Sequence, residues 1–573
     1  MSDKPLPIKL VLCWHMHQPQ YLDPSSGKYR LPWTYLHAIK DYVDMVAHLE
    51  NIPGARAVVN FAPTLLEQIE DYATQVREFL ETGSPINDPM LDALANPVLT
   101  DTAEERLTLV MNCLKANEER LINIYPRFQL LADMVRWMHG RPEAADYFND
   151  QFLADILVWY HLAWMGETVR RSDERIKRLI EKGHGFTLRE RRALMGIIGE
   201  ILSGVLLRYR KLAEEGVIEL SMTPYAHPIM PLMLDINTAK EAMPDISLPL
   251  IDHYPGGEER VRWHIEHGLE VYERIFETRP TGCWPSEGSV SEATIRLLDE
   301  YGYKWAASGE IVLSNSMRKQ YGHDVSKLKD WLHMPYQLFD TKMTGFFRDD
   351  GLSDAIGFQY SDWHADDAVG DFINNVNHIA DKCGGECNVV SVIMDGENAW
   401  EHYPANGWYF LSALYEQLAA HPRIELTTFQ DIIDMKMPAA PMTRMVSGSW
   451  VYGTFSTWIG DKDKNRAWEM LADAKKCFDN LVEDASLNGA RLEAAERQLA
   501  ICEGSDWCWW FGEYNPEGTV SDFERLYRRQ LVTLYQLMGE SPPEYLRYSF
   551  AQGSGAPAAG GVMRHGKPGS NGA

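Results

Sequence analysis

Two short acidic segments carry the residues best suited to catalysis. Asp395-Gly396-Glu397 follows the apolar run Val389–Met394, and Glu287 lies between Trp284-Pro285 and a Gly-Ser pair. A strand buried on both faces has no structural need for acids at its end, so these carboxylates indicate a functional site. Paired carboxylates cleave glycosidic bonds: one protonates the leaving oxygen, and the other attacks or stabilises the anomeric carbon.

Two histidines, His15 and His17, stand two residues apart at the end of the apolar run Ile8–Trp14. In a strand this spacing places both side chains on the same face. Two kinds of chemistry fit the pair. An HxH pair is half of a typical zinc site, whereas neutral imidazoles in a cleft donate hydrogen bonds to sugar hydroxyls.

Three further segments combine His, Arg, Asp and Trp with turn residues. Each by itself is typical of a capped loop or an aromatic core cluster, but their joint occurrence favours a carbohydrate site. The segments are Thr223–Pro228 with His227, Phe347–Asp354 with Arg348, and Glu503–Trp510 with Trp507.

The composition agrees with a sugar-binding site. The chain has 18 Trp, 26 Tyr and 19 Phe in 573 residues, and aromatic faces stack on sugar rings, although a large core also uses them. A net charge of -27 without a basic patch argues against nucleic acid as a partner. Phosphate-binding GxGxxG and GxxxxGK[ST] loops and the GxSxG elbow are absent from the sequence, so nucleotide and serine-hydrolase chemistry have no support.

The apolar segments are too short for a membrane partner or an exported chain. No uncharged apolar run approaches the roughly 18 residues of a membrane span, and the N-terminal Leu10–Trp14 is shorter than the roughly 7–15 residues of a secretory core. Eight scattered cysteines lack the spacing of a zinc module. We therefore expect a cytoplasmic protein.

Short apolar runs alternate with helical patterns, which predicts an α/β fold with a mainly parallel sheet. The polar candidates lie at or just after the carboxyl ends of these runs, where an α/β barrel builds its site. The expected strands are Ile8–Trp14, Ala57–Phe61, Val217–Met222, Lys304–Ala307, Met343–Phe347, Val389–Met394 and Ile424–Thr428.

The chain divides into three parts. Residues 1–436 are predicted to form the catalytic barrel, with a helical insertion at about 63–215, where the apolar spacing is helical throughout. Residues 437–548 follow a proline-bearing connector and are expected to form a helical region that contributes to the cleft. Residues 549–573 are rich in Gly, Ser, Pro and Ala and are expected to be disordered.

Four motifs resemble, in order and spacing, the signature regions of glycoside hydrolase family 57. They are His15–Pro19, Gly216–Leu220 with Thr223–Pro228, Trp284–Glu287 and Met394–Glu397. The resemblance extends from residue 8 to about residue 515. It implies a distorted (β/α)7 barrel with a helical C-terminal region, retaining action on an α-glucan or malto-oligosaccharide, and no required metal or cofactor.

The resemblance also implies residue roles. Glu287 looks like the nucleophile and Asp395 like the general acid/base. By the same resemblance, the sugar subsites would be lined by His15, His17, His227, Trp284 and Asp354. Further candidates for substrate binding are Arg348, Glu397, Trp450 and Trp507. The segment Asp395–Glu401 is similar to that of amylopullulanase and α-amylase-like members, whereas branching enzymes carry a different sequence after the nucleophile.

The expected function is a retaining hydrolase of α-1,4-glucosidic bonds that forms a covalent glycosyl-enzyme. A 4-α-glucanotransferase or a branching-type enzyme would use the same two acids. A metal-dependent carbohydrate hydrolase or deacetylase, with His15, His17 and an Asp holding zinc, belongs to a different class; Gln18-Pro19 after His17 argues against it. A non-catalytic glycan-binding protein fits poorly with the presence of both acids.

Overall fold

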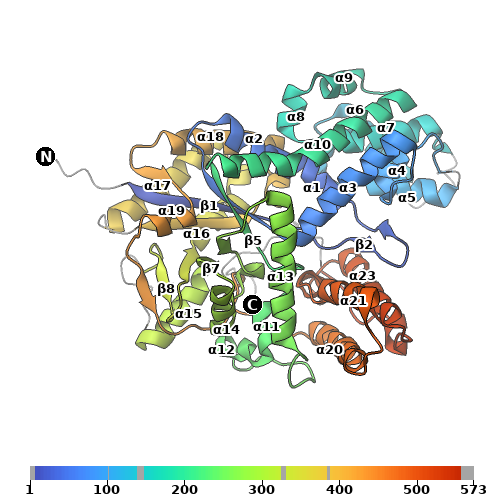
Figure 1. The fold of residues 1–573 in the computed structure, drawn as a ribbon. Coiled ribbons are helices and arrows are strands. Elements are labelled where there is room, and N and C mark those ends of the chain that lie inside the picture. Colours follow the sequence, from blue (N-terminus) through green and yellow to red (C-terminus); the bar gives the residue numbers. More distant parts are fainter. Residues whose placement is uncertain (1–6, 101, 139–146, 324–330, 384–387, 556–573) are drawn as a thin grey trace.

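Seven parallel strands close into a barrel in the computed structural model, which describes residues 7–100, 102–138, 147–323, 331–383 and 388–555. The order around the ring is β10-β1-β4-β5-β6-β7-β9, and β9 pairs with β10 to close it (Figure 1). The expected α/β barrel is confirmed. The strands are β1 (Ile8–Met16), β4 (Ala57–Phe61), β5 (Ile218–Met222), β6 (Gly282–Cys283), β7 (Trp305–Gly309), β9 (Thr344–Arg348) and β10 (Val389–Asp395).

Two strand predictions differ from the structure. The two-residue β6 was missed, because a run this short leaves no pattern in the sequence. Ile424–Thr428 was expected among the barrel strands, but β11 (Ile424–Leu426) pairs with β1 only at Ile8, Lys9 and Leu10 and lies off the ring. Strand β8 (Tyr336–Leu338) adds antiparallel to β9 and carries β12 (Ala440–Met442).

Helices surround the barrel and connect its strands. Their apolar faces join one continuous core with the strands. They are α1 (Trp33–His37), α2 (Val43–Asn51), α11 (Met230–Leu234), α12 (Ala239–Ala242), α13 (Gly257–Phe276), α14 (Glu292–Glu300), α15 (Glu310–Tyr321), α16 (Asp350–Phe358), α17 (Ala365–Cys383), α18 (Trp408–Ala419) and α19 (Phe429–Asp434). Among the described residues no helix is long and apolar enough to cross a bilayer.

A group of helices lies between β4 and β5, where the sequence has helical spacing and no strand signal. The longest, α10, begins with a capping box in which Thr187 and Glu190 bond each other's backbone N–H. The helices are α3 (Pro63–Thr82), α4 (Pro89–Ala95), α5 (Ala103–Cys113), α6 (Pro126–Met138), α7 (Asp150–Ala163), α8 (Glu167–Ser172), α9 (Glu174–Lys182) and α10 (Leu188–Glu214).

A second group of helices follows the barrel and lies on the same side of it as the first group (Figure 1). These are α20 (Lys462–Glu483), α21 (Gly489–Cys502), α22 (Asp506–Trp510) and α23 (Glu517–Met538). Of the expected disordered segment, residues 556–573 lie outside the described residues. Ser554 and Gly555 donate backbone hydrogen bonds to Glu513 and Asn515, so the described start of this segment is ordered.

A buried ionic cluster joins the second helical group to the barrel. Glu503, after α21, accepts hydrogen bonds from Arg260 (2.9 Å) and Tyr254 (2.5 Å), and its Oε2 lies 2.8 Å from His264 Nε2. Burial raises the pKa of Glu503, but Arg260 and His264 outweigh it and lower this pKa to about 2. The cluster therefore anchors the chain immediately before Ser505 and Asp506, which reach the barrel mouth.

Gly282 permits β6 to pass Trp305, a fully buried residue of β7. A Cβ at position 282 would lie 1.7 Å from the indole ring. We expect Gly282→Ala to destabilise the fold by about 3 kcal/mol or more, at the upper end of overpacking. Gly196→Ala in α10, where a Cβ meets open space, is the matched control and should cost nothing. Urea unfolding measures the stability of both variants. If their unfolding midpoints were equal, the Trp305 indole would have room to move away from the added methyl group.

Candidate active site

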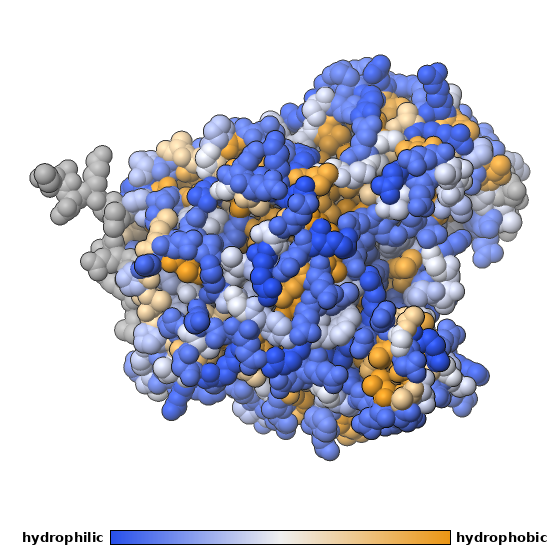
Figure 2. All heavy atoms as spheres, in the orientation of Figure 1, coloured by the Kyte–Doolittle hydropathy of each residue, from blue (hydrophilic) through white to orange (hydrophobic). Residues whose placement is uncertain are grey.

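A cleft of about 820 Å³ opens at the carboxyl ends of the barrel strands. Most of the atoms on the face shown in Figure 2 belong to hydrophilic residues, and the cleft is lined by both polar and aromatic side chains. Of the sequence-predicted residues, the cleft brings together His15, His17, Glu287, Arg348, Asp395, Glu397 and Trp450.

Strand register places the first of these residues at one level of the barrel. His15 pairs with Asp395 of β10 on one side and with Asn60 of β4 on the other. Asn60 in turn pairs with Ser221 of β5. Since parallel strands end at the same edge, residues nearly 400 positions apart in the chain meet there.

The candidate nucleophile Glu287 is held by a loop that follows the barrel. Its backbone is in the left-handed region (φ 56°, ψ 28°), a strained conformation that tends to occur at functional sites. Val290 and Gly448 form an antiparallel bridge, and Trp450 N–H donates to the Glu287 carbonyl at 3.0 Å. The Trp450 indole then donates to Glu287 Oε2 at 2.9 Å. A hydrogen bond to the carboxylate favours its ionised form, as a nucleophile requires.

The side chain of Arg348 packs against the ring of Trp450. The guanidinium is buried, donates to the Ile393 carbonyl at 2.7 Å and pairs with Asp350 at 2.6 Å and Asp354 at 2.7 Å. It lies 5.3 Å from the centroid of the Trp450 ring, within cation–π range. Asp354 thus orients the arginine, and the arginine orients the tryptophan that holds Glu287.

The candidate acid Asp395 has the opposite environment. Burial raises its pKa, and a 2.9 Å hydrogen bond from Asn398 and the positions of His17 and Arg348 oppose this only in part. Burial also raises the pKa of Glu397 well above its usual value, as do the charges of Asp395 and Asp41. A carboxyl that keeps its proton suits a general acid.

Three histidines stack between the two acids. The ring of His17 lies 3.9 Å from that of His227, and His15 Nε2 lies 3.2 Å from His227 Nε2. Burial, followed by the neighbouring histidines, lowers the pKa of His15 to about 3 and that of His227 well below its usual value. The neutral chain Asn60–His15–His227–Ser505 has one donor and one acceptor per ring, so the tautomer of one histidine determines that of the next.

Asp506 of α22 completes this cluster from the C-terminal helices. Its Oδ1 lies 2.8 Å from His17 Nε2. Ligand atoms of His17, His227 and Asp506 lie within 4.8 Å of one another, so these three residues could hold a metal ion. The zinc alternative from the sequence placed His15 in that role instead of His227. In the structure, His15 bonds Asn60 and His227.

Four residues predicted to bind substrate are not among those that line the cleft in the described part of the chain. His227, Trp284 and Asp354 lie directly behind it: His227 Nδ1 is 3.8 Å from Glu287 Oε1, and Trp284 packs 5.3 Å from Trp450. They are positioned to orient the lining residues. Trp507 is 2% exposed, donates to the Ile501 carbonyl and lines a separate small cavity.

Several cleft residues were missed by sequence reasoning. Trp509 and Trp510 belong to the same aromatic cluster as Trp507, but the sequence does not show which face of the short helix meets the cleft. Trp33 and Trp164 lie outside the segments that the sequence analysis singled out, although His37 and His161 are within one helical turn of them. The cluster Glu503–Trp510 was the one available signal, and Asp506 lies within it.

Comparison with known proteins supports the same class of enzyme. Residues 11–446 match the model of glycosyl hydrolase family 57, so the chain belongs to this family of glycoside hydrolases. No curated protein sequence matches it.

Solved structures of glucan-active enzymes share the fold at low identity. A branching enzyme from Thermococcus kodakaraensis has a TM-score of 0.56 and 15% identity, covering 92% of this chain and 90% of that one. The α-amylase AmyC from Thermotoga maritima has a TM-score of 0.53 and 14% identity, covering 95% of this chain and 96% of that one. A 4-α-glucanotransferase from Thermococcus litoralis has a TM-score of 0.51 and 13% identity, covering 93% of this chain and 60% of that one.

The buried neutral His15 predicts a measurable effect of pH on stability. Its pKa is about 3 in the folded protein and about 6.5 in the unfolded chain, so between these values only the unfolded chain binds the proton. The free energy of unfolding therefore falls as the pH falls, by up to about 1.4 kcal/mol per pH unit from this site.

We expect His15→Gln to make this dependence shallower by about that slope between pH 6 and 4. Urea unfolding at each pH measures it. The exposed His184→Gln should keep the original slope. If both variants kept it, His15 would not be the buried neutral group described above.

Proposed function

We propose that the chain is a retaining α-glucan hydrolase in which Glu287 is the nucleophile and Asp395 the general acid/base. The observation that carries the proposal is the contrast between the two acids. The Trp450 indole favours the ionised form of Glu287, whereas burial favours the protonated form of Asp395. The activities named for the similar structures, α-amylase, branching enzyme and 4-α-glucanotransferase, support an α-glucan as substrate.

The proposed reaction has two steps, formation and hydrolysis of a glycosyl-enzyme. A Glu287 oxygen attacks the anomeric carbon while the glycosidic C–O bond breaks and the Asp395 proton passes to the leaving oxygen. This leaves a glycosyl ester on Glu287 and a carboxylate on Asp395. In the second step water attacks the same carbon, Asp395 takes its proton, and Glu287 leaves as a carboxylate.

Transfer to a sugar hydroxyl shares the first step and differs only in the attacking group. A 4-α-glucanotransferase or a branching-type activity is therefore the second candidate. Two of the similar structures are named as a branching enzyme and a 4-α-glucanotransferase, which supports this candidate. The zinc-dependent class is the third, and the cluster of His17, His227 and Asp506 is the observation that supports it.

Product analysis separates these candidates. Incubation with maltoheptaose, amylose and pullulan should give shorter products only; products longer than the substrate would instead establish transfer. The same assay after treatment with EDTA should give unchanged rates, because two carboxylates perform the reaction without a Lewis acid. Loss of activity that zinc restores would favour the metal-dependent class.

Substitution of the two acids should separate their roles. Glu287→Gln removes the attacking oxygen, and we expect activity on every glucan to fall by roughly 10³-fold or more. Asp395→Ala removes only proton transfer. A substrate with a good leaving group should still form its glycosyl-enzyme, and external azide, which needs no general base, should speed release.

The control is Glu258→Gln, a change at an exposed acid of α13, which should keep full activity. If azide rescued Glu287→Ala with an inverted product and had no effect on Asp395→Ala, the roles would have to be exchanged.

A further inference from the structure

The carboxyl end of β7 lies behind the cleft, next to the two segments that meet at Glu287. Strand β7 ends in Ser308 and Gly309, and neither is among the residues that line the cleft in the described part of the chain. Its neighbour in the ring is β6, the short strand that precedes Glu287. On the other side Gly309 pairs with Arg348 of β9, whose side chain packs against Trp450.

Ser308 holds the backbone immediately after Glu287. The residue is 1% exposed, and its Oγ donates a hydrogen bond to the Gly288 carbonyl at 2.6 Å. Glu287 and Gly288 are consecutive residues in the left-handed region, with φ values of 56° and 57°. A non-glycine residue in this region is strained and persists only where the surrounding structure fixes it. The hydrogen bond from Ser308 is such a contact, and it comes from the barrel.

Two other hydrogen bonds hold the shape of this turn. The Gly288 N–H donates to the Pro285 carbonyl at 2.8 Å, and the Ser289 N–H donates to the Ser286 carbonyl at 2.9 Å. Donor and acceptor both belong to the turn, so these bonds do not fix its position relative to the strands. The bond from Ser308 does, because it joins the turn to β7.

Gly309 leaves the space in which the Trp450 backbone lies. Its φ is -84°, a value open to every residue, so space rather than conformation favours glycine here. A Cβ at position 309 would lie 2.7 Å from Trp450 Cα and 3.4 Å from the Trp450 carbonyl oxygen. Both are backbone atoms, so a different rotamer of Trp450 would not relieve the contact. An added methyl group would therefore displace the Trp450 backbone or the end of β7.

The two residues affect the same pair of hydrogen bonds. Trp450 donates twice to Glu287, from its backbone N–H to the carbonyl at 3.0 Å and from its indole to Oε2 at 2.9 Å. Both bonds depend on the spacing of the two residues, since a donor and acceptor more than about 3.5 Å apart no longer form a hydrogen bond. Ser308 fixes the turn that carries Glu287, and Gly309 sets how closely Trp450 can approach it.

We propose that Ser308 and Gly309 are positioning residues for the nucleophile. They keep Glu287 and Trp450 at the spacing that both hydrogen bonds require, so the carboxylate is oriented before the substrate arrives. Because neither residue lines the cleft, their effect falls on the rate of attack and not on the affinity for substrate. This inference rests on the proposed function, because it takes Glu287 as the nucleophile.

Ser308→Ala tests the first residue. Since a misplacement of about 1 Å can cost about 100-fold, we expect kcat on maltoheptaose to fall by roughly tenfold or more while KM changes by less than about twofold. Ser316→Ala is the matched control. Ser316 of α15 is fully buried, and its Oγ donates to the Val312 carbonyl at 2.7 Å. Both variants should lose similar stability in urea, but only Ser308→Ala should lose activity.

Gly309→Ala tests the second residue independently, and it should lower kcat by a similar factor with little change in KM. Gly199→Ala is its control. A Cβ at position 199 would also lie 2.7 Å from a neighbour, Val76 Cγ1, where α10 packs against α3. Neither of these residues lines the cleft, so overpacking at this position should leave kcat unchanged.

Fluoride release from α-maltosyl fluoride measures nucleophilic attack by itself. In the Asp395→Ala background no acid protonates the leaving group, and fluoride departs without one. Addition of Ser308→Ala or Gly309→Ala to this background should slow the first turnover by roughly tenfold or more. Addition of Ser316→Ala should not slow it.

Unchanged fluoride release with both added substitutions, or an equal loss of kcat in the two controls, would overturn the proposal. A rise in KM without a fall in kcat would also overturn it, because both residues would then act on substrate binding. Failure of the proposed function is a different result: Glu287→Gln would keep the activity of the parent enzyme, and this inference would fall with it.

Discussion

The site depends on the closure of the barrel at Arg348. This residue ends β9, and its backbone pairs with Ser391 of β10, the contact that turns an open sheet into a ring. Its side chain continues the same connection by bonding the Ile393 carbonyl and supporting Trp450. Asp395 at the end of β10 and Glu287 after β6 face one cleft because the ring closes. In an open sheet with the same strand order, β10 and β6 would be separated by three strands, and the two side chains would lie far apart.

Burial has a different electrostatic effect at each group of the site. It raises the pKa of Asp395 and Glu397 and lowers the pKa of His15 and His227, because the charged form of each would lose its hydration. Glu287, in contrast, receives the Trp450 indole as a donor. The mouth of the barrel thus brings together several titratable groups whose charged forms burial disfavours.

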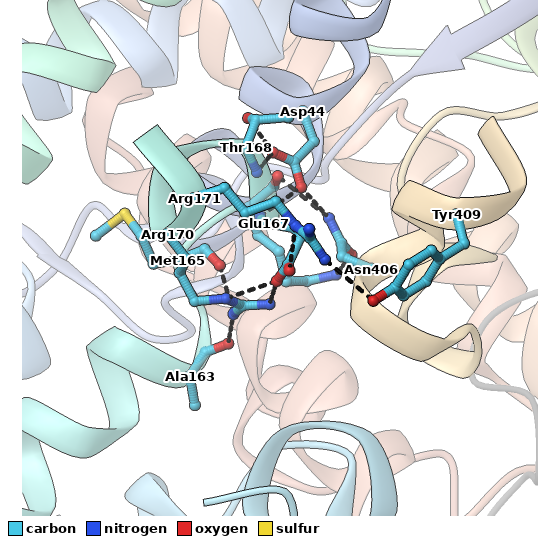
Figure 3. A network of polar contacts seen from close by, with 10 residues as sticks. Asp44, Ala163, Met165, Glu167, Thr168, Arg170, Arg171, Asn406 and Tyr409 are labelled. Atoms are coloured by element: carbon cyan, nitrogen blue, oxygen red, sulfur yellow. Dashed lines mark hydrogen bonds and ion pairs between the residues drawn. The ribbon is translucent and has the colours of Figure 1, made fainter. Parts of the chain in front are cut away.

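The barrel supplies the two candidate acids, whereas the segments outside it shape the cleft. Trp450 arrives from the loop after β12, Asp506 and Trp509 from the C-terminal helices, and Trp164 from the helices between β4 and β5. The buried ion pair of Arg260 with Glu503, and the hydrogen bonds from the Glu167 and Thr168 backbone to Asp44 (Figure 3), fix two of these additions to the barrel. Buried ion pairs contribute little net stability, but they define one geometry. Two chains with the same barrel and the same two acids can therefore differ in what they bind.

The sequence by itself determined six of the seven barrel strands, and it singled out the two candidate acids and the two histidines that the cleft brings together. These features are local: an apolar run that ends in Asp395-Gly396-Glu397 carries its own signal, whatever the rest of the chain does. Tertiary structure decided that Trp450 donates to Glu287, that Asp506 meets His17, and that Trp507 is buried while its neighbours Trp509 and Trp510 line the cleft. It also decided that His37 faces the cleft with the buried ion pair of Lys40 and Asp41 behind it. Each of these depends on which residues meet after the ring closes, and the periodicity of the sequence encodes the face of an element without naming its partner.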